Sequence, residues 1–81
     1  MSVNVFFYSY YKELTGCAQT GEELAAGSTV DALFEKLALR FPRLASLRKS
    51  TLIAVGLEYQ DGEYELREGD QVSLFPPVQG G

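Results

Sequence analysis

A single apolar stripe of helical period, between Val30 and Phe41, constrains the fold of this chain more than any other feature. Ser28 and Thr29 precede the stripe, and their hydroxyl groups are suited to cap the exposed N–H groups of a first helical turn. Pro42 follows it, and because proline lacks an N–H and disfavours the α conformation in the residue before it, the helix is expected to end there. The apolar side chains recur three or four residues apart and therefore share one face: Val30, Leu33, Phe34, Leu37, Ala38 and Phe41.

Strand-like segments lie on both sides of this helix. Val3–Tyr8 is rich in β-branched and aromatic residues, and a weaker strand is expected near Gln19–Ala25. After the helix, Leu52–Val55 and Gln71–Phe75 are predicted to form two more strands. The segment Tyr10–Gly16 is interpreted as a turn-like connection.

Glycine-containing turns are predicted among the later strands. Asp61-Gly62 supplies the positive φ angles of a type I′ turn, so Tyr59–Tyr64 is predicted to form a hairpin. Arg67–Asp70 predicts a second turn, immediately before the last strand. The two prolines after residue 75 end that strand, since neither can donate to a ladder.

One apolar helix face needs one sheet face to cover it, which predicts an α+β domain of two layers, a mixed sheet packed on one main helix. A chain of 81 residues buries only about 60% of its unfolded surface, so a large enclosed active site would take apolar volume that the fold needs. We expect one domain at residues 1–75, acting as a binding or carrier module, followed by an extended tail at residues 76–81.

The tail is the most informative segment for function. Its residues are Pro76, Pro77, Val78, Gln79, Gly80 and Gly81. The two prolines fix φ near −65°, so the chain leaves the domain as a stiff, extended stub. The two glycines lack a Cβ and can enter a slot too narrow for any side chain. At about 3.3 Å per residue the tail reaches roughly 20 Å beyond the domain, far enough to enter another protein's active site.

A terminal glycine carboxylate is suited to acyl activation. Because a carboxylate is a poor electrophile, a partner must first convert Gly81 to an acyl-adenylate with ATP. A sulfur nucleophile can then displace AMP and leave a thiocarboxylate. The chain has no G-x-x-x-x-G-K-[ST] loop, so we expect the partner, and not this chain, to bind the ATP. The prediction requires residue 81 to be the true end of the protein.

The charge and hydropathy of the chain argue against nucleic-acid and membrane binding. The formal charge is −4, whereas proteins that bind nucleic acid usually carry a basic stripe that neutralises phosphates. The loose cluster of Arg40, Arg43, Arg48 and Lys49 is interpreted as a solvated face. No apolar run approaches the roughly 20 residues that span a bilayer, and the first residues lack the features of a signal peptide. The expected location is the cytoplasm.

Reactive side chains are few. Cys17 is the only cysteine and the chain has no histidine, so neither an activated thiol nor a zinc site is expected. The acidic groups at Glu22-Glu23 and at Glu63, Glu65 and Glu68 are interpreted as solvated surface and not as paired catalytic carboxylates. The domain itself is therefore expected to be non-catalytic and to bind no metal or cofactor.

The C-terminal residues resemble the ubiquitin-like sulfur-carrier family and, within it, the small subunits of molybdopterin synthase. Residues 68–81 are E-G-D-Q-V-S-L-F-P-P-V-Q-G-G, similar to the G-D-x-V-x-x-F-P-P-V-x-G-G ending of that family. Val5–Phe7, Lys12–Gly16 and Thr29–Leu33 give weaker support. Gly56, where the family often has a polar residue, and the residues after it depart from the pattern. The resemblance implies the β-grasp fold of ubiquitin, in which the first and last strands pair.

The resemblance also implies a chain that donates sulfur and leaves catalysis to others. A ubiquitin-activating-type adenylyltransferase would adenylate Gly81, and a sulfur donor such as a cysteine desulfurase or a rhodanese would supply the sulfur. The large subunit of molybdopterin synthase, in a heterotetramer of two large and two small subunits, would receive the tail and provide the catalytic basic residues. The acceptor would be cyclic pyranopterin monophosphate, which becomes the dithiolene of molybdopterin.

Alternation along the strands predicts a partner-binding face opposite the helix. If the helix covers the odd-numbered residues of Val3–Phe7, then Phe6 and Tyr8 point away from it. Pairing of the first and last strands would bring Phe75 to the same face, and Tyr59 is a further candidate. Exposed apolar clusters usually mark interaction surfaces, and aromatic residues are enriched among interface anchors. The competing interpretation is that these aromatics fill a second small core under the loops.

Three other functions remain open from the sequence. The same carrier chemistry could serve thiamine synthesis, tRNA thiolation or the synthesis of a sulfur-containing amino acid. A ubiquitin-like modifier would instead be attached through Gly81 to lysines of target proteins. A plain interaction domain would carry out no covalent chemistry.

Overall fold

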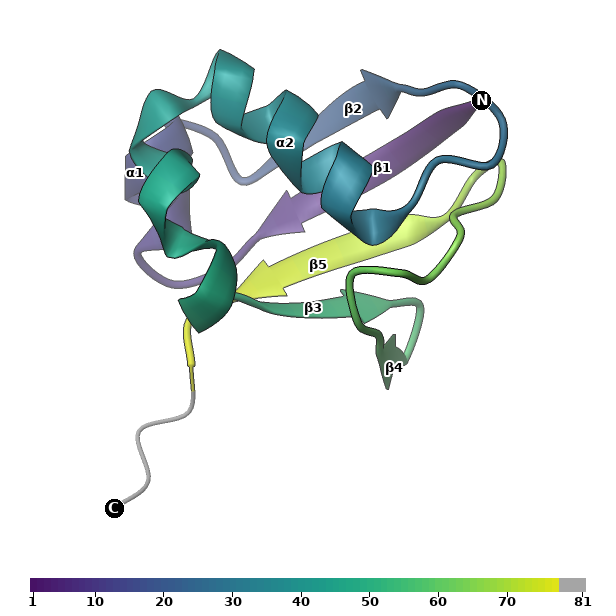
Figure 1. Ribbon diagram of the computed structural model, residues 1–81. Helices are drawn as coiled ribbons and strands as arrows, with labels where there is room; N and C mark the ends of the chain where they lie inside the picture. The colour runs from purple at the N-terminus through teal and green to yellow at the C-terminus, as the bar shows by residue number, and fades with distance from the viewer. Residues whose placement is uncertain (78–81) are drawn as a thin grey trace.

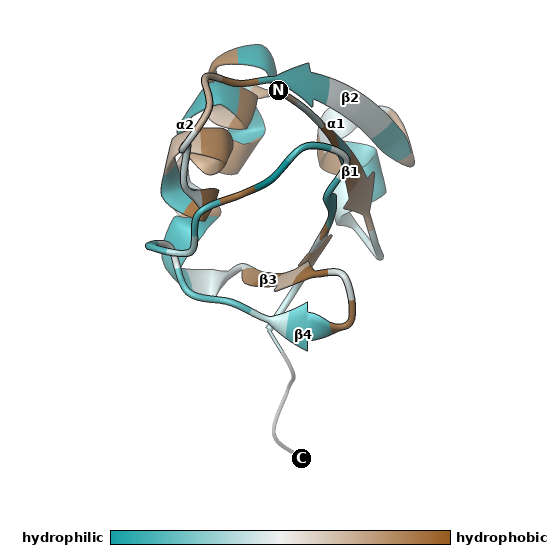
Figure 2. Ribbon diagram, turned by 90° about the vertical axis from the view of Figure 1, so that its right-hand side faces the viewer, coloured by the Kyte–Doolittle hydropathy of each residue, from teal (hydrophilic) through white to brown (hydrophobic). Residues whose placement is uncertain are grey.

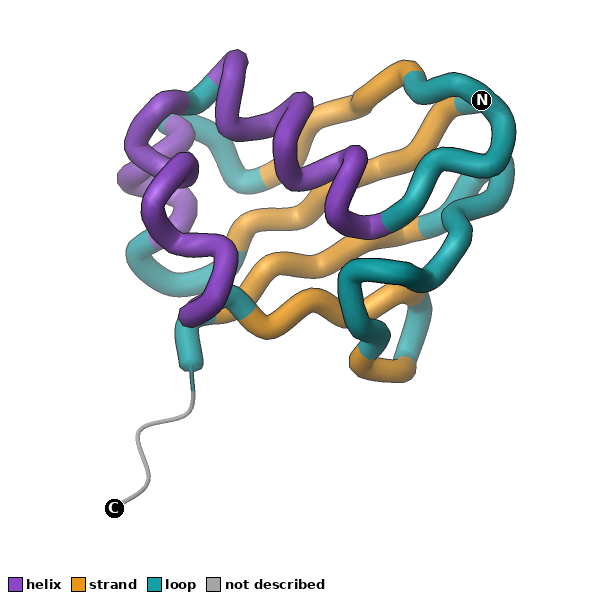
Figure 3. The backbone as a smooth tube through the Cα atoms, in the orientation of Figure 1, coloured by secondary structure: helices purple, strands orange, loops and turns teal. Residues whose placement is uncertain are grey.

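The chain folds into a five-stranded mixed sheet with one long helix across one face (Figures 1 and 3). The computed structural model describes residues 1–77. In chain order the elements are β1 (Ser2–Phe7), α1 (Tyr11–Thr15), β2 (Gln19–Glu23), α2 (Val30–Arg40), the 3₁₀ segment η1 (Pro42–Ser50), β3 (Leu52–Val55), β4 (Glu58–Tyr59) and β5 (Gln71–Phe75). The predicted two-layer α+β architecture is confirmed.

The first and last strands lie side by side in the middle of the sheet. The strand order is β2-β1-β5-β3-β4. β1 and β5 run parallel, with Val5 opposite Val72, whereas the other neighbouring pairs are antiparallel. Because β5 has a neighbour on each side, the point at which the chain leaves the sheet is held by both.

Helix α2 begins where the sequence predicts and ends within one residue of the predicted end. The N–H of Ala32 donates to Thr29 Oγ1 at 3.2 Å, so Thr29 is the N-cap. The helix ends at Arg40, one residue before the predicted Phe41, and η1 starts with Pro42. At 11 residues α2 is the longest α-helix described, and none of the helices within residues 1–77 has the length and hydropathy to cross a bilayer.

The core lies between α2 and the inner face of the sheet. Its central members are at most 1% exposed and come from β1, α2 and β5: Val3, Val5, Phe7, Val30, Leu33, Leu37, Val72 and Leu74. In Figure 2 the brown, hydrophobic stretches of α2, β1 and β3 surround this space. The predicted helical stripe is therefore the core face of α2, with Ala38 and Phe41 only partly buried at its end.

The connection predicted as a turn between the first two strands contains the short helix α1. Tyr11 is fully buried and anchors this helix. Its O–H lies 2.7 Å from Thr51 Oγ1, and Thr51 in turn donates to the carbonyl oxygen of Leu47 at 2.6 Å. Thr51 has only one hydroxyl proton, so Tyr11 is the donor. Five residues are too few to show a helical pattern of apolar residues, so this helix could not be predicted from the local sequence. Burial of Tyr11 stabilises it.

The hairpin predicted at Asp61-Gly62 is wrong. The turn between antiparallel neighbours lies earlier, where Gly56 has a φ of +62° between β3 and β4. The carbonyl oxygen of Gly62 instead accepts from the N–H of Asp31 at 3.0 Å. A Cβ on Gly62 would clash with the carboxylate of Asp31. This glycine allows the loop to approach the start of α2 closely. The contact joins residues far apart in the sequence, so the Asp-Gly pair alone could not predict it.

The interpretation of Glu22 as a solvated residue is wrong as well, whereas Arg40 is exposed, as predicted. Glu22 is 7% exposed and accepts from Arg40 Nη1 at 2.5 Å. It lies opposite Val3 on the helix-facing side of β2, so its carboxylate enters the edge of the core and needs a cation. Arg48 likewise pairs with Asp31, at 2.7 Å.

Replacement of Tyr11 by Phe tests the buried hydroxyl chain. We expect Tyr11→Phe to lower the free energy of unfolding by about 1 kcal/mol near neutral pH, since Thr51 Oγ1 loses its donor. Burial raises the pKa of the Tyr11 phenol above its ordinary value of 10.0. The neutral phenol is thus favoured in the folded state, and its contribution is complete below pH 10.0 and declines above it, as the unfolded chain ionises. Urea unfolding of both proteins should show the deficit of the variant shrinking above this pH; a constant deficit would contradict the assignment.

Candidate functional site

The root of the tail is anchored in the middle of the sheet. β5 ends at Phe75, as predicted, and this residue lies opposite Leu52 of β3. On the other side of β5, the N–H of Tyr8 donates to the carbonyl oxygen of Leu74 at 3.2 Å. In Figure 1 this end of β5 lies beside the start of β3 and the end of η1. Neighbours on both sides therefore fix the position from which Pro76 continues.

Only the first two of the predicted tail residues belong to the described structure. Pro76 is half-buried and Pro77 is exposed. The strand stops before them because neither residue has an N–H to donate to a neighbouring strand. The remaining tail residues lie outside the described residues, and their roles stay predictions: Val78, Gln79, Gly80 and Gly81.

Three aromatic side chains gather beside this root, on the face of the sheet opposite α2; they form what we call the aromatic cluster, Tyr8, Tyr59 and Phe75. The rings of Tyr8 and Phe75 stack, with 4.7 Å between centroids and 11° between planes. The ring of Tyr59 meets that of Phe75 edge-on, with centroids 6.3 Å apart. Both geometries are favourable for aromatic pairs. Because Tyr8 is 42% and Tyr59 is 65% exposed, the cluster presents an apolar surface to solvent next to Pro76.

Phe6 lies on the same face but one row away from the aromatic cluster. The parallel register places it beside Ser73, two residues before Phe75. None of the ring pairs among residues 1–77 includes Phe6, which is half-buried. The structure thus brings together Tyr8, Tyr59 and Phe75 of the four predicted aromatic residues.

Two aliphatic residues on this face were missed from the sequence. Leu52 lies opposite Phe75, and Ala54 lies opposite both Ser73 and Tyr59. Leu52 is half-buried and extends the apolar surface from the aromatic cluster onto β3, whereas Ala54 is buried. Alternation with the buried Ile53 was the available signal, but a strand of four residues is too short for its outward face to be assigned without its neighbours.

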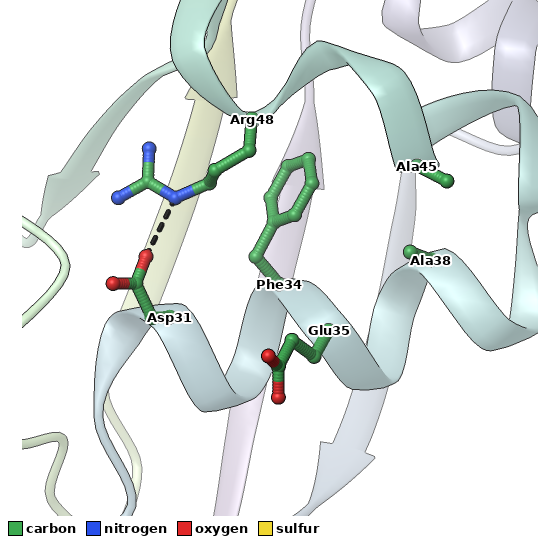
Figure 4. Close-up of a pocket in the computed structure, with 6 residues that line it drawn as sticks. All are labelled: Asp31, Phe34, Glu35, Ala38, Ala45 and Arg48. Carbon is green, nitrogen blue, oxygen red and sulfur yellow. Dashed lines mark hydrogen bonds and ion pairs between the residues drawn. The ribbon is translucent and has the colours of Figure 1, made fainter.

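A shallow hollow of about 310 Å³ lies on the other side of the molecule, between α2 and η1 (Figure 4). Its floor includes the Phe34 ring, and the Arg48 guanidinium lies over that ring at 5.7 Å from the centroid. The same guanidinium is held by Asp31. The remaining lining residues are Glu35, Ala38 and Ala45. Of the two carboxylates in this set, Asp31 is paired with Arg48 and Glu35 is exposed to solvent.

The thiol and one of the acidic groups singled out in the sequence make contacts within the domain. Cys17 is half-buried, with Sγ 3.8 Å from Thr15 Oγ1. Among residues 1–77, no three histidine, cysteine or carboxylate side chains come together as a metal site. Glu68, one of the predicted surface carboxylates, accepts from the N–H of Ser2 at 2.9 Å and so supports the start of β1. The aromatic cluster is the feature best placed to recognise another protein.

Truncation of Tyr59 tests whether the aromatic cluster is a surface or a second core. Because its ring is 65% exposed, Tyr59→Ala is expected to change the free energy of unfolding by less than about 1 kcal/mol. Phe75→Ala removes a half-buried ring and is expected to cost about 1–2 kcal/mol, leaving a folded domain. Urea unfolding measures both. A loss above about 3 kcal/mol for Tyr59→Ala would show that the ring belongs to a core.

Comparison with protein families places the whole fold and tail in a known group. The model of the ThiS family matches residues 5–81. The chain is 36% identical over 81 residues to the molybdopterin synthase sulfur carrier subunit of Escherichia coli (strain K12), covering 98% of this chain and 99% of that protein.

Solved structures agree in fold. The putative molybdopterin converting factor, subunit 1, of Pyrococcus furiosus has a TM-score of 0.89 at 28% identity, covering 96% of this chain and 99% of that one. SAMP1 of Haloferax volcanii also has a TM-score of 0.89, at 21% identity and with complete coverage of both chains. The predicted ubiquitin-like β-grasp fold is confirmed by these neighbours.

Proposed function

The chain belongs to the ThiS family, and from that membership we propose that it is the sulfur-carrier subunit of a molybdopterin synthase. The observation that carries the proposal is the continuity of three features: a central last strand, a Pro-Pro stub and a Gly-Gly ending. The relative from Escherichia coli, which is similar over 99% of its length, is a molybdopterin synthase sulfur carrier subunit.

The proposed chemistry takes place at the carboxylate of Gly81, which must be free in the mature protein. An adenylyltransferase of the ubiquitin-activating type forms the acyl-adenylate and releases pyrophosphate from ATP. The terminal sulfur of a persulfide on a cysteine desulfurase or a rhodanese then displaces AMP and forms an acyl disulfide with Gly81. A second thiol cleaves this disulfide, which releases the thiocarboxylate and leaves a disulfide on the sulfur donor. In the synthase, this thiocarboxylate transfers its sulfur to cyclic pyranopterin monophosphate, and water supplies the oxygen that returns Gly81 to a carboxylate. The partners bind the ATP and supply the catalytic side chains.

In this proposal the domain positions the start of the tail for the chemistry at Gly81. β1 and β3 hold β5 up to Phe75, so the two prolines begin from a fixed point. The aromatic cluster lies at that same point and exposes apolar surface without a covering element among residues 1–77. We propose that the large subunit of the synthase docks on the aromatic cluster, which would align the tail with its active site.

Extension of the chain tests the role of Gly81. Addition of one alanine after Gly81 is expected to abolish thiocarboxylate formation, because the activated carboxylate would no longer follow the two glycines. Folding should be unchanged. Intact mass spectrometry after incubation with the adenylyltransferase, ATP and a sulfur source should show the oxygen-to-sulfur increment, about 16 Da, on the parent chain alone. The same increment on the extended chain, with the alanine retained, would contradict the proposal.

Two tyrosines of equal exposure offer a matched test of the docking face. Tyr8 and Tyr10 are each 42% exposed, but only Tyr8 belongs to the aromatic cluster, whereas Tyr10 packs on Tyr11. Tyr8→Ala is expected to weaken binding to the large subunit by about 2 kcal/mol, roughly 30-fold. Tyr10→Ala should change it less than about threefold. Calorimetric titration of each folded variant measures this, and equal losses for both would place the interface elsewhere.

The same experiments distinguish the alternatives. A thiocarboxylate without affinity for the large subunit would indicate another client, such as thiamine synthesis or tRNA thiolation. A lysine-linked Gly-Gly remnant on other proteins would indicate a modifier. The likeness to SAMP1, at 21% identity, concerns the fold and does not favour the modifier.

A further inference from the structure

Strand β2 forms one edge of the sheet and has a single neighbour, β1 (Figure 1). The N–H of Phe7 donates to the carbonyl oxygen of Ala18 at 2.9 Å. In an antiparallel ladder, the N–H and C=O groups of alternate residues point toward the neighbouring strand. This bond shows that Ala18 points its carbonyl group toward β1, so every second residue from Gln19 onward points its N–H and C=O groups away from the sheet. The outward residues are Gln19, Gly21 and Glu23. An edge of this kind is a template for pairing with another strand.

Two cationic side chains from α2 reach this edge and bind its outward carbonyl groups. Arg40 Nη1 donates to the carbonyl oxygen of Gly21 at 3.1 Å. Lys36 Nζ donates to the carbonyl oxygen of Glu23. Four residues along a helix rise about 6 Å, and two residues along a strand rise about 7 Å. The spacing of the two cations on α2 therefore matches the spacing of the two carbonyl groups on β2.

The buried carboxylate of Glu22 holds both cations in place. Arg40 Nη1 lies 2.5 Å and Lys36 Nζ lies 3.8 Å from its carboxylate oxygens. Arg40 Nη2 also donates to Thr20 Oγ1 at 2.9 Å. The buried carboxylate between them therefore holds the two cations at the edge of the sheet.

We propose that Lys36 and Arg40 prevent β2 from pairing with β2 of a second copy of this chain. Antiparallel self-pairing about a two-fold axis at Gly21 would place Gln19 opposite Glu23, so no carboxylate would face another on that side. Isologous pairing of this type closes on itself as a dimer. The cations occupy the acceptors that such a dimer needs.

Removal of both cations tests the proposal. The Lys36→Met/Arg40→Met variant is expected to form a dimer at least tenfold more tightly than the parent chain, measured by sedimentation velocity over a range of concentrations. The matched control is Arg43→Met/Lys49→Met, which removes the same charge from two exposed residues of η1 and should sediment as the parent does. Hydrogen exchange should show new protection at the amides of Gly21 and Glu23 in the dimer alone.

A proline at the edge identifies the surface. Gly21 turns its N–H outward, so Gly21→Pro removes a donor of the proposed dimer without removing a β1–β2 hydrogen bond. Added to the double variant, it should restore the monomer. A folded double variant that stays monomeric, or a dimer that survives Gly21→Pro, would overturn the proposal. If the double variant does not fold, Lys36→Met decides: it keeps the Arg40–Glu22 pair, and it should self-associate measurably more than the parent.

Discussion

The parallel pairing of β1 with β5 is the interaction on which the rest of the structure depends. It joins the two ends of the chain in the centre of the sheet, where Val5 and Val72 lie opposite each other and are fully buried. Contacts between residues so distant in sequence form only when almost the whole domain is present. The same pairing holds the backbone at Leu74, so the stability of the core and the placement of the tail root have one physical origin.

The features predicted correctly from the sequence are those with a local cause. The capping hydroxyl of Thr29 and the missing N–H of Pro42 are properties of single residues, and the helix between them follows. Strand β5 agrees residue for residue because prolines end it. At the candidate site, strand alternation and the resemblance together identified Tyr8 and Phe75, which stack.

The features that were missed depend on residues far apart in the sequence. Glu22 is polar and lies in a strand of mixed composition, and only the position of Arg40 at the end of α2 explains its burial. Gly62 follows an aspartate, as turn glycines often do, yet its role is to approach Asp31. Leu52 joins the apolar surface only because its partner across the ladder is Phe75. To predict any of these contacts one must know how the strands and helices are arranged, and no local sequence pattern gives that arrangement.

The parallel direction of β1 and β5 also separates the two ends of the domain. Because Asn4 pairs with Gln71 at the start of β5, Asn4 lies about 13 Å from Phe75 along the strand, and β1 begins still farther away, at Ser2. Figure 1 shows the N-terminus and the tip of the β5 arrow at opposite sides of the molecule. An affinity tag, a fluorophore or a whole protein joined ahead of Met1 would therefore project away from the tail root, and the protein could be immobilised there while the aromatic cluster stays accessible.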